Sequence, residues 1–338
     1  MALKSKSSEG KERSGRRLSN LLGLDFATSG VKAVRLKKNK GQLVLAAADI
    51  LPPIGLDAED KPLLSKPLSA YYAALCVTMD NTILRVFPQI LPEENEDIEA
   101  IVRENLSAAS DYRTSGLVLS RARGKRESSI LGVAVPEKTV QRYLSLFANG
   151  APAPRSLEIS GLAAFSAFLF NYGAQTETQT ICLIETGARY TYAAFLCRNQ
   201  LQLVNRFDVG GASLQRQVQA ALGVDAEMAE TILSGGSVDV SAPVRQVLSP
   251  FTRQLSIYRE FVERQSKSSL SAVYISGGQA SSSHWQEAVK EVLGVVPQIW
   301  NPFEKIIIQP GAFPEKFKGQ ESRFAAAVGA ALAGMDVL

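Results

Sequence analysis

The sequence predicts an α/β fold in which one domain pattern occurs twice. The first observation is a run of three strand-like segments separated by turn residues: Leu21–Phe26, then the alternating segment Val31–Lys37, then Leu43–Ile50. Apolar runs and alternation bounded by Gly, Asn and Ser are typical of an antiparallel meander.

The second observation is that this pattern recurs 160 residues further along the chain. Five aligned pairs are identical: Ala33 and Ala193, Leu36 and Leu196, Gln42 and Gln202, Leu43 and Leu203, Val44 and Val204. An acidic residue also ends the first strand of each copy, as Asp25 and as Glu185. A repeat of strand order and turn positions predicts two copies of one α/β domain, with a central cleft between them.

The third observation is a different pattern between the copies. A strand (Ile83–Ile90), a helix (Glu93–Ala109), two strands (Leu117–Arg121 and Ile130–Val135), a helix (Glu137–Ala148) and a strand (Arg155–Ile159) follow in order. This β-α-β-β-α-β order predicts a small α+β insertion. The predicted divisions are a disordered basic arm at 1–20, a first subdomain at 21–80 and 160–180, the insertion at 81–159, and a second half at 181–338.

The remaining elements follow from helical spacing and apolar runs. Helices are predicted at Gly161–Phe170, Ala212–Leu222, Ala226–Leu233, Val244–Gln265, Trp285–Leu293 and Phe324–Met335, and strands at Val273–Ser276 and Val295–Trp300. Pro250 should kink the long helix or mark its true start. The Ala- and Gly-rich composition of the first and last of these helices favours close packing in a core.

Composition narrows the possible partners. The chain has 338 residues, 46% hydrophobic and 21% charged, which is typical of a globular protein. The first 20 residues hold six basic and two acidic side chains, so the net charge of +4 lies in the arm and the body is neutral. A neutral body argues against nucleic-acid binding. The arm either attracts anionic lipid or serves only as a solubilising tail.

Other segments indicate a cytoplasmic protein. No apolar window approaches the roughly 18 residues of a membrane span, and no apolar stretch follows the basic N-terminus as in a secretory signal. Cys76, Cys182 and Cys197 lie in apolar runs without a C-x-x-C spacing, which favours buried thiols in a reducing compartment. His284 is the only histidine, so a zinc site or a Ser-His-Asp triad is not expected.

Candidate ligand-binding residues gather in four turns. The chain has neither a G-x-x-x-x-G-K-[ST] nor a G-x-G-x-x-G motif. After Asp25, the short residues Ala27, Thr28, Ser29 and Gly30, followed by Lys32, could surround an anion, and Glu185, Thr186 and Gly187 form the second copy. The pairs Gly210-Gly211 and Gly277-Gly278 end strands and would let a backbone lie close to a ligand. Taken singly, each is more readily explained as a plain tight turn, but four of them in duplicated order favour a ligand site. Asp25 and Glu185 are the candidate metal ligands.

The segment Leu22–Leu36 resembles the opening of the type IV pilus assembly protein PilM family, which belongs to the actin-like ATPases and is close to FtsA. Further stretches in the same order are similar to this family: Val209-Gly210-Gly211, Ala221–Val224, Ala229-Glu230, Ile275–Gly278, Asn301–Phe303 and Arg323–Gly334. The resemblance implies duplicated actin-like (ribonuclease H-like) domains with ATP and Mg²⁺ in the cleft. It adds Glu230 and Gln279 to the candidate nucleotide-binding residues.

Five positions depart from the pattern that the resemblance implies. Ala27 stands in place of a glycine, Ser160 in place of an acid, Glu185 in place of an aspartate, Leu233 in place of a lysine and Gln279 in place of a glycine. Phosphoryl transfer depends on metal placement and electrostatic positioning. We therefore expect weak or absent ATP hydrolysis.

The resemblance also implies a role as a scaffold at the cytoplasmic face of the inner membrane. Such a protein would hold the cytoplasmic tail of a PilN-like bitopic protein in a groove, with strand Tyr71–Val77 and helix Ile98–Leu106 as candidate walls. An active actin-like ATPase, a sugar kinase of the same fold and an FtsA-like filament former are the alternatives. The sequence leaves open the oligomeric state and the choice between a pilus and a secretion system.

Overall fold

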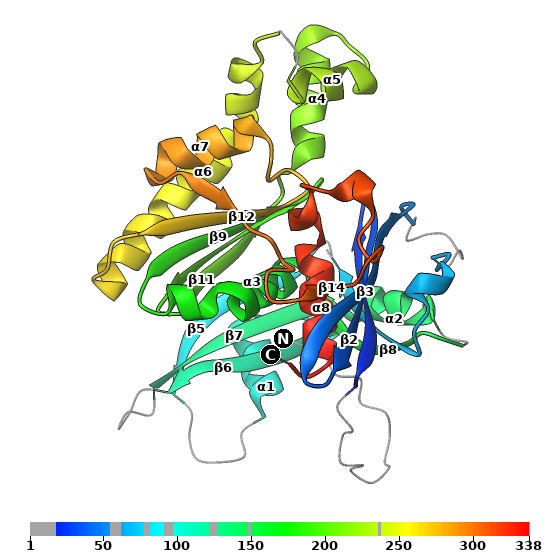
Figure 1. Cartoon of the computed structure of the whole chain (residues 1–338). Helices are drawn as coiled ribbons and strands as arrows, with labels where there is room; N and C mark the ends of the chain where they lie inside the picture. The colour runs from blue at the N-terminus through cyan, green and yellow to red at the C-terminus, as the bar shows by residue number, and fades with distance from the viewer. Residues whose placement is uncertain are drawn as a thin grey trace. The chain divides into compact units, whose positions relative to one another are not determined.

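The computed structural model describes residues 18–54, 62–77, 81–90, 97–121, 127–147, 150–235 and 238–337. The chain divides into two compact units: Met1–Tyr172 with Asn301–Leu338, and Gly173–Trp300. Most of the predicted basic arm, and with it the predicted lipid contact, lies outside the described residues. Figure 1 shows the course of the chain.

The first unit contains a mixed six-stranded sheet. Its strands are β1 (Asn20–Ala27), β2 (Gly30–Asn39), β3 (Gln42–Leu51), β4 (Tyr72–Val77), β8 (Ala153–Ile159) and β14 (Ile307–Ile308), in the order β14-β3-β2-β1-β4-β8. The first three form the predicted antiparallel meander. β4 then pairs parallel with β1, and β8 pairs parallel with β4. Consecutive residues of β1 and of the first half of β2 are buried, so both faces of the sheet are covered there.

The second unit repeats this path. Its strands are β9 (Thr180–Thr186), β10 (Thr191–Cys197), β11 (Gln200–Phe207), β12 (Ala272–Gly277) and β13 (Pro297–Ile299), in the order β11-β10-β9-β12-β13. A meander is again followed by a strand parallel to the first. The register shifts between Arg35 and Leu36 in the first copy, and between Phe195 and Leu196, 160 residues on, in the second. The predicted duplication is confirmed, and it includes a register irregularity at equivalent positions of the two meanders.

A three-stranded antiparallel sheet lies between β4 and β8 in sequence. It consists of β5 (Ile83–Ile90), β6 (Tyr112–Arg121) and β7 (Glu127–Pro136), in the order β5-β7-β6. Helix α1 (Ile98–Asn105) covers it, and Val102 of this helix packs into its core. Helix α2 (Glu137–Ser145) follows, joined to β6 by an ion pair between Arg113 and Glu137.

The predicted content of the insertion needs one correction. The strand predicted at Arg155–Ile159 exists as β8, but it is not part of the small sheet, because it pairs in parallel with β4 of the larger sheet. The start of the helix predicted from Glu93 lies outside the described residues.

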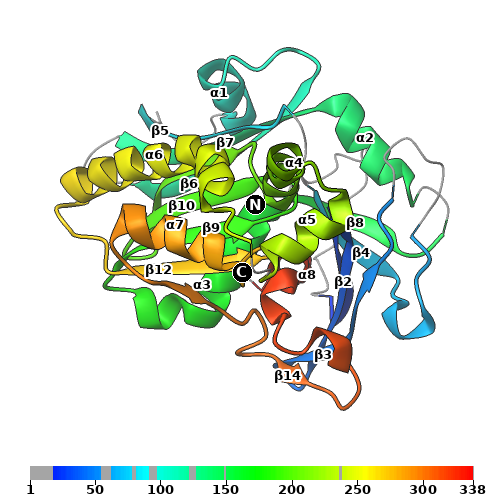
Figure 2. The ribbon, with the colours of Figure 1, turned by 90° about the horizontal axis from the view of Figure 1, so that it is seen from above.

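Helices cover the second sheet. They are α4 (Gly211–Leu222), α5 (Ala226–Leu233), α6 (Ser241–Ser266) and α7 (Ser283–Leu293), and α6 and α7 run side by side in Figures 1 and 2. The apolar stripe of α6, including Phe251 and Leu255, is buried against β9, β10 and β12 with Trp285 of α7. Pro250 lies inside α6 and does not mark its start.

The C-terminal segment belongs to the first unit, which differs from the predicted second half at 181–338. Helix α8 (Ala325–Gly334) packs on β1, β2 and β4. Two glycines permit this packing: a Cβ on Gly23 would collide with the Ala327 carbonyl, and a Cβ on Gly329 with the Ala163 carbonyl of helix α3 (Ser160–Thr176). The second unit ends earlier in the sequence than predicted, because nearly every residue of α8 is apolar and buried and the helix completes the core of the first unit.

Candidate functional site

The predicted phosphate-binding turn of the first copy is a tight β1–β2 hairpin centred on a buried carboxyl group. Asp25 on β1 lies directly opposite Lys32 on β2, and both side chains are buried. The Ser160 hydroxyl donates a hydrogen bond to Asp25 Oδ1 at 2.9 Å, and Cys76 Sγ lies 3.6 Å from the same hydroxyl. The Lys32 ammonium donates to Ser29 Oγ and to the Gly30 carbonyl, at 3.0 and 3.3 Å.

The protonation of Asp25 reflects this environment. Burial raises the pKa of Asp25 above its ordinary value, whereas the positive charge of Lys32 and the hydrogen bond from Ser160 oppose that increase. The carboxyl group thus accepts a hydrogen bond from Ser160 and is attracted by the positive charge of Lys32.

The rest of this hairpin is explained by its own backbone. Gly30 has a φ of 123°, and a Cβ there would lie 2.7 Å from the Leu51 carbonyl oxygen. Glycine is therefore required by the turn and by the neighbouring strand β3. Thr28 and Ser29 are exposed, and Ala27 is half-buried.

The second copy of the turn is closed by hydrogen bonds within its own unit. The Thr186 hydroxyl donates to the Ser276 carbonyl at 2.9 Å, and the Gly187 N–H donates to the Tyr190 carbonyl at 2.8 Å. Gly277 has a φ of 93°, and a Cβ there would collide with Thr186. Glu185 is buried at the end of β9.

Helix α4 begins directly against this turn. A helix N-terminus offers free N–H groups that can bind an anion. Here the Gly211 N–H donates to the Gly187 carbonyl at 3.1 Å, and the Ala212 N–H donates to the Ala188 carbonyl at 2.8 Å. Two N–H groups that could otherwise bind a phosphate are therefore already bonded to carbonyl groups of the preceding turn.

Gln279 covers the same helix start. A Cβ on Gly211 would lie 2.5 Å from Gln279 Nε2, so the side-chain amide rests on the glycine. A Cβ on Gly210 would lie 2.6 Å from the Ala188 carbonyl oxygen. Both glycines are thus explained by close packing inside the protein.

The other predicted residues are less closely joined to these turns. Glu230 is exposed on α5, and its carbonyl accepts a hydrogen bond from the Ser234 N–H at the end of that helix. Leu233 is half-buried and packs against the core of the second unit. A Cβ on Gly278 would meet no atom within 4 Å.

A nucleotide with its metal fits these residues poorly. Asp25 already has Ser160 and Lys32 as partners, and the donors at the start of α4 are bonded to Gly187 and Ala188. Within the described ranges, no group of three or more His, Cys, Asp or Glu side chains could hold a metal ion. No catalytic step through ATP follows from these two turns.

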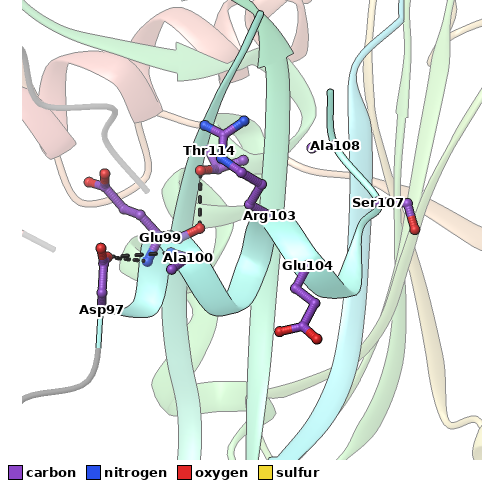
Figure 3. Close-up of a pocket in the computed structure, with 8 residues that line it drawn as sticks. All are labelled: Asp97, Glu99, Ala100, Arg103, Glu104, Ser107, Ala108 and Thr114. Carbon is purple, nitrogen blue, oxygen red and sulfur yellow. Dashed lines mark hydrogen bonds between the residues drawn. The ribbon is translucent and has the colours of Figure 1, made fainter. Parts of the chain in front are cut away.

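A separate pocket of about 540 Å³ opens along α1 and is not among the turns singled out from the sequence (Figure 3). Its lining residues are Asp97, Glu99, Ala100, Arg103, Glu104, Ser107, Ala108 and Thr114. The Asp97 carboxylate caps the helix by accepting from the Glu99 and Ala100 N–H groups, and Thr114 Oγ1 donates to the Glu99 carbonyl. The sequence signal for this pocket was the prediction that helix Ile98–Leu106 forms one wall of a groove.

The accessible charged groups of this pocket are mainly carboxylates. The Arg103 guanidinium donates to the carbonyls of Ala109 and Tyr112, both at 2.8 Å, so its position is fixed by the backbone. Glu99 and Glu104 are exposed. The predicted wall at Tyr71–Val77 is wrong for most of its length, because Ala73–Val77 is buried inside the sheet and only Tyr71 and Tyr72 are exposed.

Comparisons with known proteins place the chain in a class and then in a family. Two meander-based α/β domains, one carrying a small inserted sheet, define an actin-like ATPase fold. The sequence profile of type IV pilus assembly protein PilM matches residues 129–335, more than half of the chain. The chain belongs to the PilM family.

A solved structure shares the fold of this chain. A structure described as a PilM-PilN type IV pilus biogenesis complex superimposes with a TM-score of 0.78 at 21% identity, covering 94% of this chain and 99% of that one. A Bacteroides thetaiotaomicron protein of actin-like ATPase fold and unknown function gives 0.47 at 11% identity, with 87% and 95% covered. MreB 5 of Spiroplasma citri bound to AMPPNP gives 0.46 at 11%, with 92% and 94% covered. No curated protein matches. In the described part of the chain, no helix is both long and apolar enough to cross a membrane.

Proposed function

We propose that this protein is a scaffold of a type IV pilus inner-membrane assembly complex that binds the cytoplasmic tail of a PilN-like bitopic protein. Membership of the PilM family is the observation that carries this proposal. The similar fold of a PilM in complex with PilN supports the choice of partner. The protein would then lie on the cytoplasmic face of the inner membrane, held there by its partner.

The α1 pocket is the proposed contact for the tail. It is open, and its volume of about 540 Å³ suits a few residues of an extended peptide. The exposed carboxylates of Glu99 and Glu104 favour a tail that carries lysine or arginine. Because Asp97 and Arg103 are fixed by backbone hydrogen bonds, the pocket is preorganised for binding.

Nucleotide turnover plays no part in this function. The turns that follow Asp25 and Glu185 are closed by hydrogen bonds within the protein. This favours a structural role for the fold over nucleotide hydrolysis. ATP with Mg²⁺ would bind weakly, and an ATPase or a sugar kinase receives no support from the described residues.

The decisive experiment measures binding of a synthetic peptide to the full chain by fluorescence anisotropy. The peptide has the cytoplasmic tail sequence of a PilN-like protein from the same organism. Ala100→Trp fills the exposed face of α1 and should abolish binding. Lys138→Trp adds the same bulk to the exposed face of α2 and should leave it unchanged. If the peptide binds both variants equally, the tail does not contact the α1 pocket.

A further inference from the structure

The outer edge of the second sheet carries a groove that is separate from the two turns and from the α1 pocket. β11 is the last strand of the order β11-β10-β9-β12-β13, and among the described strands none pairs with its outer side. In an antiparallel pair, alternate residues of an edge strand turn their N–H and C=O groups outward. These groups form a template for a further strand.

A groove of about 460 Å³ opens where the end of β11 meets α6 and α4. Asn205 and Phe207 line it from one face of β11, since they are two residues apart, and Val209 lines it just beyond the end of the strand. Gln254 and Tyr258 line it from α6. Its floor is aromatic: the Phe207 ring meets Phe251 edge-on at 4.9 Å between centroids.

Polar groups at fixed positions border this apolar floor. Asn205 Nδ2 donates to Tyr258 Oη at 2.7 Å, which joins the strand to the helix across the groove. Asp208, at the end of the strand, has a side chain 74% exposed, and one of its carboxylate oxygens lies 3.2 Å from the guanidinium of the mostly buried Arg206. An accessible carboxylate therefore stands at one end of an apolar groove beside a strand edge.

We propose that β11 and this groove dock an extended segment of a partner protein, added as a strand to the sheet edge. The outward backbone groups specify an extended main chain, and the aromatic floor specifies an apolar side chain at alternate positions. Asp208 specifies a lysine or arginine beside that apolar residue. This site lies in the second unit, whereas the α1 pocket lies in the first, so the two proposals stand independently.

A synthetic strand peptide tests the proposal on the full chain. The probe is Lys-Thr-Val-Thr-Ile-Thr-Val-Thr-Lys, and its matched control carries N-methyl groups at alternate backbone nitrogens, which block strand pairing but keep the side chains. Hydrogen exchange read by mass spectrometry should show that the probe slows exchange at Gln200–Phe207, and that the control peptide does not.

Variants then locate the contact. Gln254→Trp fills the groove, and Asp208→Lys reverses the terminal charge, so each should weaken probe binding by about tenfold or more. Two control variants carry matched changes at exposed positions away from the groove: Arg253→Trp adds the same bulk on α6, and Glu287→Lys makes the same charge reversal on α7. Both variants should bind the probe as tightly as the unchanged chain does. Thermal melting confirms that every variant folds.

Three results would overturn the proposal. The first is unchanged exchange at β11 with the probe bound or absent. The second is equal binding of the N-methylated peptide, which would indicate apolar adhesion without strand pairing. The third is a dimer in light scattering whose β11 amides are already protected, which would assign the edge to a second copy of this chain.

Discussion

Ser160 donates a hydrogen bond to Asp25 at 2.9 Å, although the two residues are 135 positions apart in the sequence. The contact joins the start of α3 to the end of β1 inside the first unit. A neutral hydroxyl thus faces the buried carboxyl group where the family resemblance implies a second acid. Two acids at this distance would repel each other unless a cation lay between them, and the hydroxyl removes that requirement.

Ser160→Ala should lower the free energy of unfolding by about 1 to 3 kcal/mol, because it leaves a buried carboxyl oxygen without its donor. Urea unfolding followed by circular dichroism measures the change. Ser166→Ala on the same helix is the control, since that side chain is only partly buried. Equal effects of the two substitutions would mean that the bond to Asp25 contributes no net stability.

Asp25→Asn should stabilise the protein more at neutral pH than in acid. Burial raises the pKa of Asp25 in the folded state. At a pH above the ordinary pKa of aspartate, the folded protein therefore holds this proton more tightly than the unfolded chain does. Stability from this group is therefore lost as pH rises from about 4 towards neutrality. Asparagine cannot ionise and removes that loss.

Urea unfolding of Asp25→Asn and of the unchanged chain at about pH 4 and about pH 7.5 checks this sign. Asp336→Asn, at a half-exposed position, is the matched control. A gain that is larger in acid than at neutral pH would show that the attraction of Lys32 outweighs the cost of burial.

Gly329→Ala should destabilise the first unit by about 3 kcal/mol, because the new methyl group would meet the Ala163 backbone, which cannot move aside as a flexible side chain can. Differential scanning calorimetry of the full chain reports the loss. Gly278→Ala is the control, since nothing lies within 4 Å of its added Cβ. A melting temperature equal to that of the control would mean that α8 and α3 can separate at little cost.

Isothermal titration should find that Mg-ATP binds the unchanged chain with a dissociation constant weaker than about 100 μM, since the donors at the start of α4 are already bonded. Gln279→Gly uncovers Gly211 and should tighten binding by about tenfold. Gln298→Gly, at an exposed position of β13, should have no such effect. Micromolar affinity of the unchanged chain would contradict this reading of the turns.

The sequence was most informative where a periodic pattern coincided with a repeat. The two meanders were predicted from alternation and turn residues, and the aligned bulges at Leu36 and Leu196 confirm the duplication. The position of α8 was not predictable in this way, because an evenly apolar helix shows no face that indicates its partner sheet. The partner of β8 was not predictable either, because its seven residues mix polar and apolar side chains without a pattern that selects one sheet.

The candidate site was predicted as residue types but not as contacts. The sequence singled out Gly210, Gly211 and Gln279, yet only the three-dimensional structure shows that carbonyls of a preceding turn bond the start of α4. Such contacts join residues far apart in the chain and leave no periodic trace. For the α1 pocket, the sequence predicted the helix as a groove wall but not the contact of Thr114, which reaches the helix from β6.

The pairing of β4 with β8 has a consequence for engineering. Tyr72 lies beside Ala153 and Val77 beside Ile159, so the small sheet and its two helices occupy a crossover connection between adjacent parallel strands. The chain leaves at one end of β4 and must return to the other end, a span of about 20 Å. A shortened protein that lacks the small sheet therefore needs a spacer that spans this length, because a tight turn could not join the two strands without breaking their pairing.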